Sequence, residues 1–215
     1  MCRLLAVCDA DPFEIPGQLR ALATIARESR EYQGDGWGCA WWDGRAWQRY
    51  RSLTPIWEDQ LDEFGETRLL LAHARSAFRN EGIAVENNMP FIDDDVAFVF
   101  NGELRGVRLT APGRTGADKL FHMLRRLGAA RDAAALRRAV DIVVRRTAYV
   151  RAMNLVMANS EGFCVVSRFG EAPDYFTMHL AREGTRLAVC SEPFPGGGGW
   201  SPIANGSVLE FRRPC

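Results

Sequence analysis

Apolar residues recur along the chain in two spacings, one typical of buried strands and one typical of helices. Short continuous apolar runs bounded by glycine, proline or polar residues indicate strands buried on both faces. Apolar residues three and four positions apart indicate helices with one buried face. The predicted strands are Arg3–Cys8, Cys39–Trp42, Ala46–Tyr50, Leu69–Ala72, Val96–Phe100, Asn154–Ala158, Phe163–Arg168, Tyr175–Leu180, Leu187–Cys190 and Ser207–Phe211, and the predicted helices are Pro16–Arg30, Ala117–Leu127 and Asp132–Arg146.

The order of these elements predicts packed sheets with helices outside them. Strands come first, a helical pair occupies the middle of the chain, and strands return in the last third. The 215 residues lie within the size range of one layered fold, and no internal repeat or linker divides them. We therefore expect residues 2–215 to form a single domain of the α+β class.

Composition and charge exclude several classes of function. The chain is 47% hydrophobic and 25% charged, as in ordinary globular proteins, and 27 basic residues balance 27 acidic ones. This balance argues against a nucleic-acid or membrane partner. No apolar stretch approaches the roughly 18 residues of a membrane helix, and Asp9 interrupts the first apolar run too early for a secretory signal. We expect a cytoplasmic protein.

The cysteines form no recognisable metal or disulfide pattern. They lack a C-x-x-C pair or a nearby histidine cluster, so the sequence predicts no metal site, and most are expected to be buried thiols. A thiol redox protein is disfavoured for the same reason. The six cysteines are Cys2, Cys8, Cys39, Cys164, Cys190 and Cys215.

Cys2 stands out because removal of Met1 would place a thiol and a free α-amine on one residue. An α-amine titrates near roughly 7.7 to 8.0, so a substantial neutral fraction can accept the thiol proton at neutral pH. A nucleophile and its base would then be joined covalently. The alternative is an incidental cysteine that packs in the first strand.

Polar residues follow two of the predicted strands. His73-Ala74-Arg75-Ser76 follows the strand that ends at Ala72, and Asn101-Gly102-Glu103 follows the strand that ends at Phe100. Such clusters at strand ends suggest a site. An asparagine amide beside an unhindered glycine N–H could stabilise an oxyanion, although Asn-Gly is also a common turn.

The combined motifs resemble those of the class II glutamine amidotransferases, which are N-terminal-nucleophile hydrolases. The resemblance covers nearly the full chain and is closest to stand-alone members. It rests on Cys2-Arg3-Leu4-Leu5, Asp35-Gly36-Trp37-Gly38, Ala72-His73-Ala74-Arg75, Pro90-Phe91, Phe100-Asn101-Gly102-Glu103 and Ser191-Glu192-Pro193.

This resemblance implies a four-layer αββα sandwich, removal of Met1, and a site that needs no cofactor or metal. Cys2 would be the nucleophile with its own amine as base, and Asn101 with the Gly102 amide would form the oxyanion hole. Arg75 would hold the substrate carboxylate, which suits a guanidinium fork. The expected substrate-binding residues are Arg75, Ser76, Trp37, Gly36 and Asp118.

The roles of three of these neighbours have structural alternatives. His73 follows a buried strand, so we assign it a supporting role as a hydrogen-bonded histidine rather than a general base. Gly36 and Trp37 would form a loop at the substrate, with Trp37 covering the pocket. The alternative is a tight turn with an anchored aromatic side chain.

Two positions depart from the family pattern. Gly116 stands where the family usually has an aspartate that binds the α-amino group of glutamine, and Met89 stands where it commonly has a histidine. Asp118, another carboxylate, or a substrate without that ammonium group would account for the first departure. The pocket around Met89 would be more apolar.

We therefore predict an amidohydrolase that cleaves a glutamine or γ-glutamyl side-chain amide through a thioester on Cys2. The acyl group would pass to water, or the ammonia would pass to a synthase subunit acting as partner. The alternative is a catalytically silent binding or regulatory protein with the same fold. The oligomeric state is left open.

Overall fold

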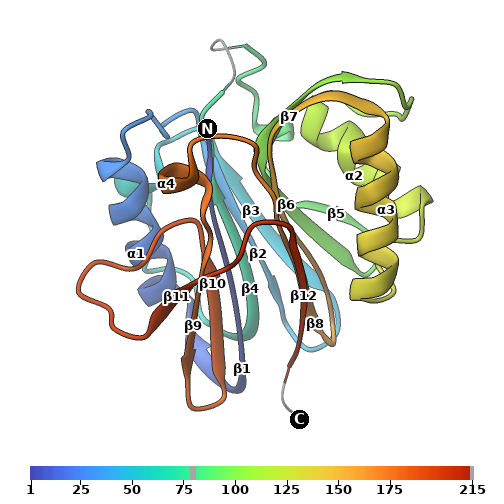
Figure 1. Ribbon diagram of the computed structural model, residues 1–215. Helices are drawn as coiled ribbons and strands as arrows, with labels where there is room; N and C mark the ends of the chain where they lie inside the picture. The colour runs from blue at the N-terminus through green and yellow to red at the C-terminus, as the bar shows by residue number, and fades with distance from the viewer. Residues whose placement is uncertain (78–80, 214–215) are drawn as a thin grey trace.

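Two β-sheets lie face to face, and helices cover their outer faces (Figure 1). The structure is a computed structural model and describes residues 1–77 and 81–213. One sheet, here called sheet A, has seven strands, and sheet B has five. Helix α1 covers sheet A, and helices α2 and α3 cover sheet B. The expected four-layer αββα sandwich is confirmed.

Neighbouring strands of both sheets pair in antiparallel fashion, and β1 lies near the middle of sheet A. Sheet A contains, in spatial order, β11 (Trp200–Pro202), β9 (His179–Glu183), β10 (Arg186–Cys190), β1 (Arg3–Glu14), β4 (Glu66–Ala74), β2 (Trp37–Trp42) and β3 (Trp47–Ser52). Sheet B contains β12 (Ser207–Arg212), β8 (Gly162–Ser167), β7 (Thr147–Asn159), β6 (Val96–Val107) and β5 (Phe91–Asp93). The helices are α1 (Ile15–Glu28), α2 (Gly116–Arg126), α3 (Ala133–Arg145) and the short α4 (Pro173–Phe176), with 3-10 turns η1 (Ile56–Glu58) and η3 (Val85–Asn87).

Side chains alternate between the two faces of each strand, and this alternation separates two hydrophobic cores. In β1, Leu4 packs in the core between the sheets and Leu5 packs against α1. In β4, Leu71 faces the core between the sheets and Leu70 faces α1. Both faces are apolar, which is why these strands read as continuous apolar runs.

The three long helices begin and end within two residues of their predicted positions. Each starts at a residue suited to a helix N-terminus. Pro16 lies in the first turn of α1, where its missing N–H is not needed. The Thr115 hydroxyl accepts a hydrogen bond from the Asp118 N–H, and the Asp132 carboxylate accepts one from the Ala135 N–H.

Two strands that carry candidate site residues run further than predicted. β4 continues through Ala74 instead of ending at Ala72, and β6 continues to Val107 instead of ending at Phe100. Asn101-Gly102 therefore lies inside a strand rather than in a turn after it. Pairing with β7 supplies partners for this backbone, so its polar side chains do not end the strand.

The predicted strand Tyr175–Leu180 is wrong in its first half. Residues Pro173–Phe176 form α4, and strand β9 begins only at His179. Proline at the first position favours this helical turn. The turn also buries Tyr175 and Phe176 against Ala152 of β7.

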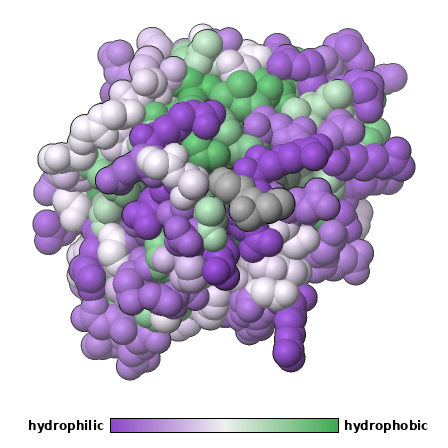
Figure 2. Space-filling view, turned by 90° about the horizontal axis from the view of Figure 1, so that it is seen from below, coloured by the Kyte–Doolittle hydropathy of each residue, from purple (hydrophilic) through white to green (hydrophobic). Residues whose placement is uncertain are grey.

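Seen from below, the end of the molecule away from the N-terminus is mostly hydrophilic, with hydrophobic residues grouped toward the top of the view (Figure 2).

Within residues 1–77 and 81–213, no helix has the length and apolar character needed to span a membrane.

The close approach of β6 and β7 at Gly102 predicts a large loss of stability in Gly102→Ala. An added Cβ would lie 2.1 Å from the carbonyl oxygen of Ala152, a backbone atom that cannot move without breaking the strand pairing. We expect a loss at or above the roughly 1 to 3 kcal/mol typical of overpacking, measured by urea unfolding. Gly17→Ala is the control, because its Cβ would meet nothing within 4 Å. Equal stability of the two variants would contradict this expectation.

Candidate active site

Cys2 precedes the first residue of β1 and lies beside the segment that follows β4. Its Sγ is 3.5 Å from the backbone nitrogen of Ser76 and 3.7 Å from the Ser76 carbonyl oxygen. The register of the two strands causes this approach, because Arg3 pairs with Ala74 and Leu4 pairs with His73. The start of β1 is thereby aligned with the end of β4.

The other side of β1 is held by Ser191, which follows β10. The Leu4 N–H donates to the Ser191 hydroxyl at 2.8 Å, and the Ser191 N–H donates to the Leu4 carbonyl at 3.0 Å. Leu4 therefore exchanges two hydrogen bonds with Ser191 on one side of β1 and lies opposite His73 of β4 on the other, and the position of Cys2 follows from this. This gives the Ser191-Glu192-Pro193 motif a structural role.

Burial raises the pKa of the Cys2 thiol above its usual range. The positive N-terminus, the Ser76 N–H and the Arg75 guanidinium act in the opposite direction, but burial is the larger effect. Met1 is attached in this structure, so the nitrogen of Cys2 is an amide and cannot accept the thiol proton. In this form the thiol stays protonated at neutral pH.

Two side chains that sequence reasoning missed surround the residue preceding Cys2. Gln33 Nε2 and the Tyr175 hydroxyl each donate to the Met1 carbonyl oxygen at 2.5 Å. The amino group of Met1 pairs with Glu31. Gln33 is completely buried, and its Oε1 has no hydrogen-bond partner among the described residues. These groups lie where removal of Met1 would free an α-amine.

No local signal could have found Gln33 and Tyr175. Tyr175 is more than 170 positions from Met1 in the sequence and falls in a segment whose predicted strand was wrong. The guanidinium groups of Arg3 and Arg30 lie 4.1 and 4.5 Å from the centroid of the Tyr175 ring. Only the folded chain brings these residues to the N-terminus.

Asn101 lies on the face of β6 that is turned toward sheet A. Phe98 stacks on Phe121 of α2 at 5.1 Å between ring centroids, so the even-numbered residues around it face the helices. Asn101 is odd-numbered, so its side chain lies on the opposite face of β6, together with the side chain of Val99. β6 packs against β1 and β4, the two strands that place Cys2.

The Asn101 amide is buried without a partner, in contrast to its neighbour. Asn101 pairs directly with Asn154 of β7, and each is 1% exposed. Asn154 donates to the Phe176 carbonyl at 2.6 Å and accepts from the Arg168 N–H at 3.0 Å. Neither Asn101 Nδ2 nor Oδ1 has a partner among the described residues. Unsatisfied buried amides are rare and call for a functional explanation.

His73 is fully buried on β4, but it is not the hydrogen-bonded histidine that the sequence suggested. Neither ring nitrogen makes a hydrogen bond of good geometry within the described residues. Burial, and then the charge of Arg75, lower the pKa of His73 to about 3, against a smaller opposing effect of the Phe100 carbonyl. This imidazole is neutral, and it lies near the carbonyl of Phe100, the residue before Asn101.

Arg75 follows β4 and is almost fully buried, with its guanidinium held by neutral groups. Nη1 donates to Asn88 Oδ1 at 3.2 Å, and Nη2 donates to the Gly82 carbonyl at 2.8 Å. It pairs with no carboxylate among the described residues. Asn88 also donates to the Ser52 carbonyl at 2.8 Å, so it is a positioning residue that the prediction missed.

Gly36 supports the backbone of Arg75, and its missing side chain leaves room for Asn88. Its carbonyl accepts the Arg75 N–H at 2.8 Å. With φ at +106°, a side chain would be strained, and a Cβ would lie 2.3 Å from the Asn88 amide nitrogen. The tight-turn alternative therefore describes Gly36 better.

The Trp37 backbone pairs with Ala74 beside Arg75, but its side chain, like that of Asp118, is held away from this cluster. Trp37 packs in the core beneath α1, and its Nε1 donates to Asp59 at 2.8 Å, so its side chain is an anchored core aromatic. The Asp118 carboxylate accepts the Arg114 N–H at 2.9 Å and lies 3.5 Å from His122. Within residues 1–77 and 81–213, no hydrogen bond or ion pair joins Asp118 to Cys2 or Arg75.

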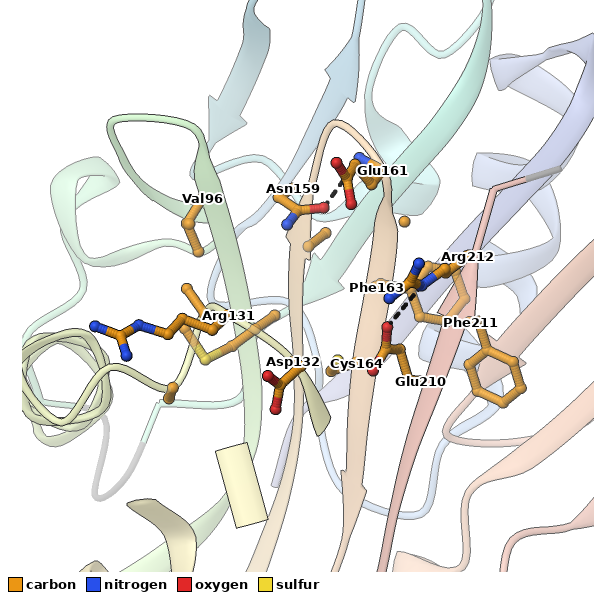
Figure 3. Close-up of a pocket in the computed structure, with 15 residues that line it drawn as sticks. Val96, Arg131, Asp132, Asn159, Glu161, Phe163, Cys164, Glu210, Phe211 and Arg212 are labelled. Atoms are coloured by element: carbon orange, nitrogen blue, oxygen red, sulfur yellow. Dashed lines mark hydrogen bonds and ion pairs between the residues drawn. The ribbon is translucent and has the colours of Figure 1, made fainter. Parts of the chain in front are cut away.

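A small pocket near the start of α3 is separate from the candidate site (Figure 3). It is lined by residues at the turn between β7 and β8, at the bottom of Figure 1, whereas the N-terminus lies at the top. Burial raises the pKa of Cys164 in this pocket to about 12, so it is a poor nucleophile. Cys8, Cys39 and Cys190 are buried thiols, and Cys215 lies outside the described residues.

Stacked sheets enclosed by helices, with a cysteine at the start of a central strand, define the class of N-terminal-nucleophile amidohydrolases. The chain belongs to the family described as "Glutamine amidotransferases class-II", whose model matches residues 1–173. This membership confirms both the resemblance seen in the sequence and the predicted enzyme class.

Among curated proteins, the γ-glutamyl-hercynylcysteine sulfoxide hydrolase of Mycobacterium tuberculosis is 25% identical over 206 residues, which cover 92% of this chain and 84% of that protein. A glutamine aminotransferase class-II domain protein from Silicibacter pomeroyi has a TM-score of 0.63 at 18% identity, with full coverage of both chains. The phosphoribosylpyrophosphate amidotransferase of B. subtilis has a TM-score of 0.69 at 14% identity, covering 99% of this chain and 49% of that one. These solved structures share the fold.

The buried neutral state of His73 predicts a specific acid sensitivity. The unfolded chain takes up a proton at this position below about pH 6.5, whereas the folded chain does so only near a pKa of about 3. Protonation of His73 in the unfolded chain should therefore lower the free energy of unfolding as the pH falls from about 6.5 toward 3. The expected slope is about 1.4 kcal/mol per pH unit.

His73→Gln removes this titration. Although the variant loses packing at neutral pH, its unfolding free energy should fall less steeply than that of the wild type between about pH 6.5 and 4.5, measured in urea at each pH. Parallel curves for the two proteins would contradict the assignment of a neutral histidine.

Proposed function

We propose that this protein, once Met1 is removed, hydrolyses a γ-glutamyl side-chain amide through a thioester on Cys2. The unpartnered Asn101 amide carries the proposal, because it is a buried hydrogen-bond donor held ready on the face turned toward the cysteine strand. A preorganised donor of this kind stabilises the charge that develops on a carbonyl oxygen in the transition state.

The freed α-amine of Cys2 takes the thiol proton, and the sulfur attacks the amide carbon. The carbonyl oxygen becomes an oxyanion that accepts hydrogen bonds from Asn101 Nδ2 and the Gly102 N–H. The ammonium group of Cys2 then gives its proton to the leaving nitrogen, the carbon–nitrogen bond breaks, and a thioester remains. Water, deprotonated by the same amine, attacks the thioester, and the thiol leaves as the acid is released.

Arg75 recognises the α-carboxylate of the glutamyl group in this proposal. Its buried guanidinium is oriented by Asn88 and has no carboxylate partner among the described residues, so an incoming carboxylate would supply the missing charge. Ser76 contributes through its backbone, which contacts the Cys2 sulfur.

Gly116 and Met89 bear on which amide is cleaved. Gly116 starts α2 with open space around its Cβ position, and Met89 is buried in the core between the sheets. Neither can pair with an ammonium group, and Asp118 is bonded to its own loop. The M. tuberculosis relative is named for hydrolysis of a γ-glutamyl compound, which favours a stand-alone γ-glutamyl hydrolase over a glutamine-fed synthase subunit.

Covalent labelling tests the nucleophile. Protein with Met1 removed should take up one equivalent of a glutamine-analogue electrophile at Cys2, read by intact-protein and peptide mass spectrometry. Protein that retains Met1 should react far more slowly, because its Cys2 nitrogen is an amide and burial raises the pKa of the thiol.

Cys2→Ala is the control for this experiment and should not be labelled. Glutamate release from glutamine and from γ-glutamyl dipeptides, each with and without cell lysate, then separates the substrates and reveals a need for a synthase subunit. Failure of Met1-free protein to label at Cys2 would instead favour the catalytically silent alternative.

The two paired asparagines provide a matched test of the oxyanion hole. Asn101→Ala should lower kcat about 10²- to 10³-fold with little loss of stability, because it removes an oxyanion donor that has no hydrogen-bond partner within residues 1–77 and 81–213. Asn154→Ala should instead cost roughly 1 to 3 kcal/mol of stability, because it breaks two buried hydrogen bonds. Steady-state kinetics and urea unfolding of both variants decide the matter, and equal effects on kcat would contradict the role of Asn101.

A further inference from the structure

We propose that a second site, distinct from the Cys2 cluster, binds a phosphate group in a groove between β3, β5 and the start of α2. β3 and β5 are edge strands of sheets A and B. The groove has a volume of about 560 Å³, and its lining includes Arg49, Arg51, Phe91, Arg114, Asp118 and His122.

Two guanidinium groups of this groove are held against one backbone oxygen. Arg51 Nη1 and Arg114 Nη2 donate to the Glu86 carbonyl at 3.1 and 3.0 Å. The two nitrogens therefore lie at most 6.1 Å apart. Arg51 Nη1 also lies 3.3 Å from the Asn88 carbonyl, which further orients this guanidinium.

These charges are not balanced by ion pairs. Arg49, Arg51 and Arg114 form no salt bridge within residues 1–77 and 81–213. Asp118 accepts the backbone N–H of Arg114 rather than its guanidinium. The Glu86 carboxylate is exposed and too far for an ion pair, although it favours the charged form of Arg51.

Burial and neighbouring positive charge both act on the pKa of Arg51. Burial lowers its pKa, and the charges of Arg49 and Arg114 lower it further. Arg49 and Arg51 occupy alternate positions of β3 and therefore share one face of the strand. Asp118 also lines the groove, but none of the three arginines forms an ion pair among the described residues, so a bound anion would relieve their repulsion.

A phosphate dianion fits this arrangement better than a carboxylate. One carboxylate pairs with one guanidinium fork, whereas the three oxygens of a phosphate monoester can accept from two guanidinium groups at once. Phe91 and Phe121 line the same groove, so the organic part of a phosphate monoester could rest on apolar surface. The ligand class is a phosphate dianion, either inorganic phosphate or a small phosphate monoester.

Isothermal titration calorimetry on the full chain tests this site. Inorganic phosphate and phenyl phosphate should bind saturably with one site per chain, and added salt should weaken both. Tighter binding of phenyl phosphate would identify a monoester as the ligand, and equal binding would identify free phosphate. Citrate, a carboxylate probe, should bind more weakly than either.

Arg51→Gln and Arg114→Gln should each raise the Kd for phosphate at least about tenfold, since each removes a charge-assisted pair. Arg49→Gln changes an exposed residue and should weaken binding without disturbing the fold, so it serves as the safeguard if Arg51→Gln unfolds. Arg45→Gln removes an exposed arginine from the same hairpin but outside the groove, and should leave the Kd unchanged.

Absence of saturable phosphate binding would overturn the proposal. So would tighter binding of citrate than of either phosphate, or an equal loss of binding in Arg45→Gln and Arg49→Gln. Thermal unfolding of each variant establishes that the titrated protein is folded. Labelling of Cys2 is a separate measurement, so failure of this site leaves the proposed hydrolase unaffected.

Discussion

The antiparallel pairing of β1 with β4 is the interaction on which the candidate site depends. Its register aligns Leu4 with His73, and as a result the Cys2 sulfur reaches the backbone of Ser76 and lies beside Arg75. A slip of one residue would send every side chain of β1 to the opposite face. Leu4 and Leu5 would exchange the two cores, so the hydrophobic pattern that stabilises the sandwich also specifies the position of the nucleophile.

Polar groups between the sheets divide into those with partners and those without. Asn154, Asn88 and Ser191 have their hydrogen bonds supplied by the protein, and each holds a neighbouring segment in place. Asn101 and His73 are buried and receive no such bonds from the part of the chain that the structure describes. Leaving buried polar atoms unpaired costs free energy, and such costs are concentrated at functional sites. Asn101 belongs to sheet B and faces sheet A, whereas His73 lies opposite Leu4 in the strand next to β1, and a substrate bound near Cys2 could complete their hydrogen bonds.

Arginine guanidinium groups are held by neutral oxygens in two places, one buried and one at the edge of the sheets. Arg75 is buried and held by neutral oxygens of Asn88 and Gly82. Arg51 and Arg114 share the Glu86 carbonyl at the edge of the sheets. Both arrangements fix a guanidinium without neutralising it, which leaves its charge available to a ligand. The short segment that includes η3 supplies oxygens to both, so one stretch of chain orients the guanidinium groups of Arg75, Arg51 and Arg114.

The sequence alone was sufficient for the features that depend on local periodicity or covalent adjacency. The three long helices follow from apolar spacing and from end signals such as Thr115 and Asp132. Cys2 was recognisable because its thiol would share a residue with a free amine, and the motifs around Arg75 and Asn101 were sufficient to indicate the family.

Tertiary structure decided which of these side chains face one another. It turned Trp37 into the core beneath α1, placed Asn101 inside a strand, and brought Gln33 and Tyr175 to the residue before Cys2. The arginine groove likewise joins β3 to the start of α2, more than 60 positions later in the chain. Strand register and packing between sheets are nonlocal, so the pattern of residues within any one segment does not contain them.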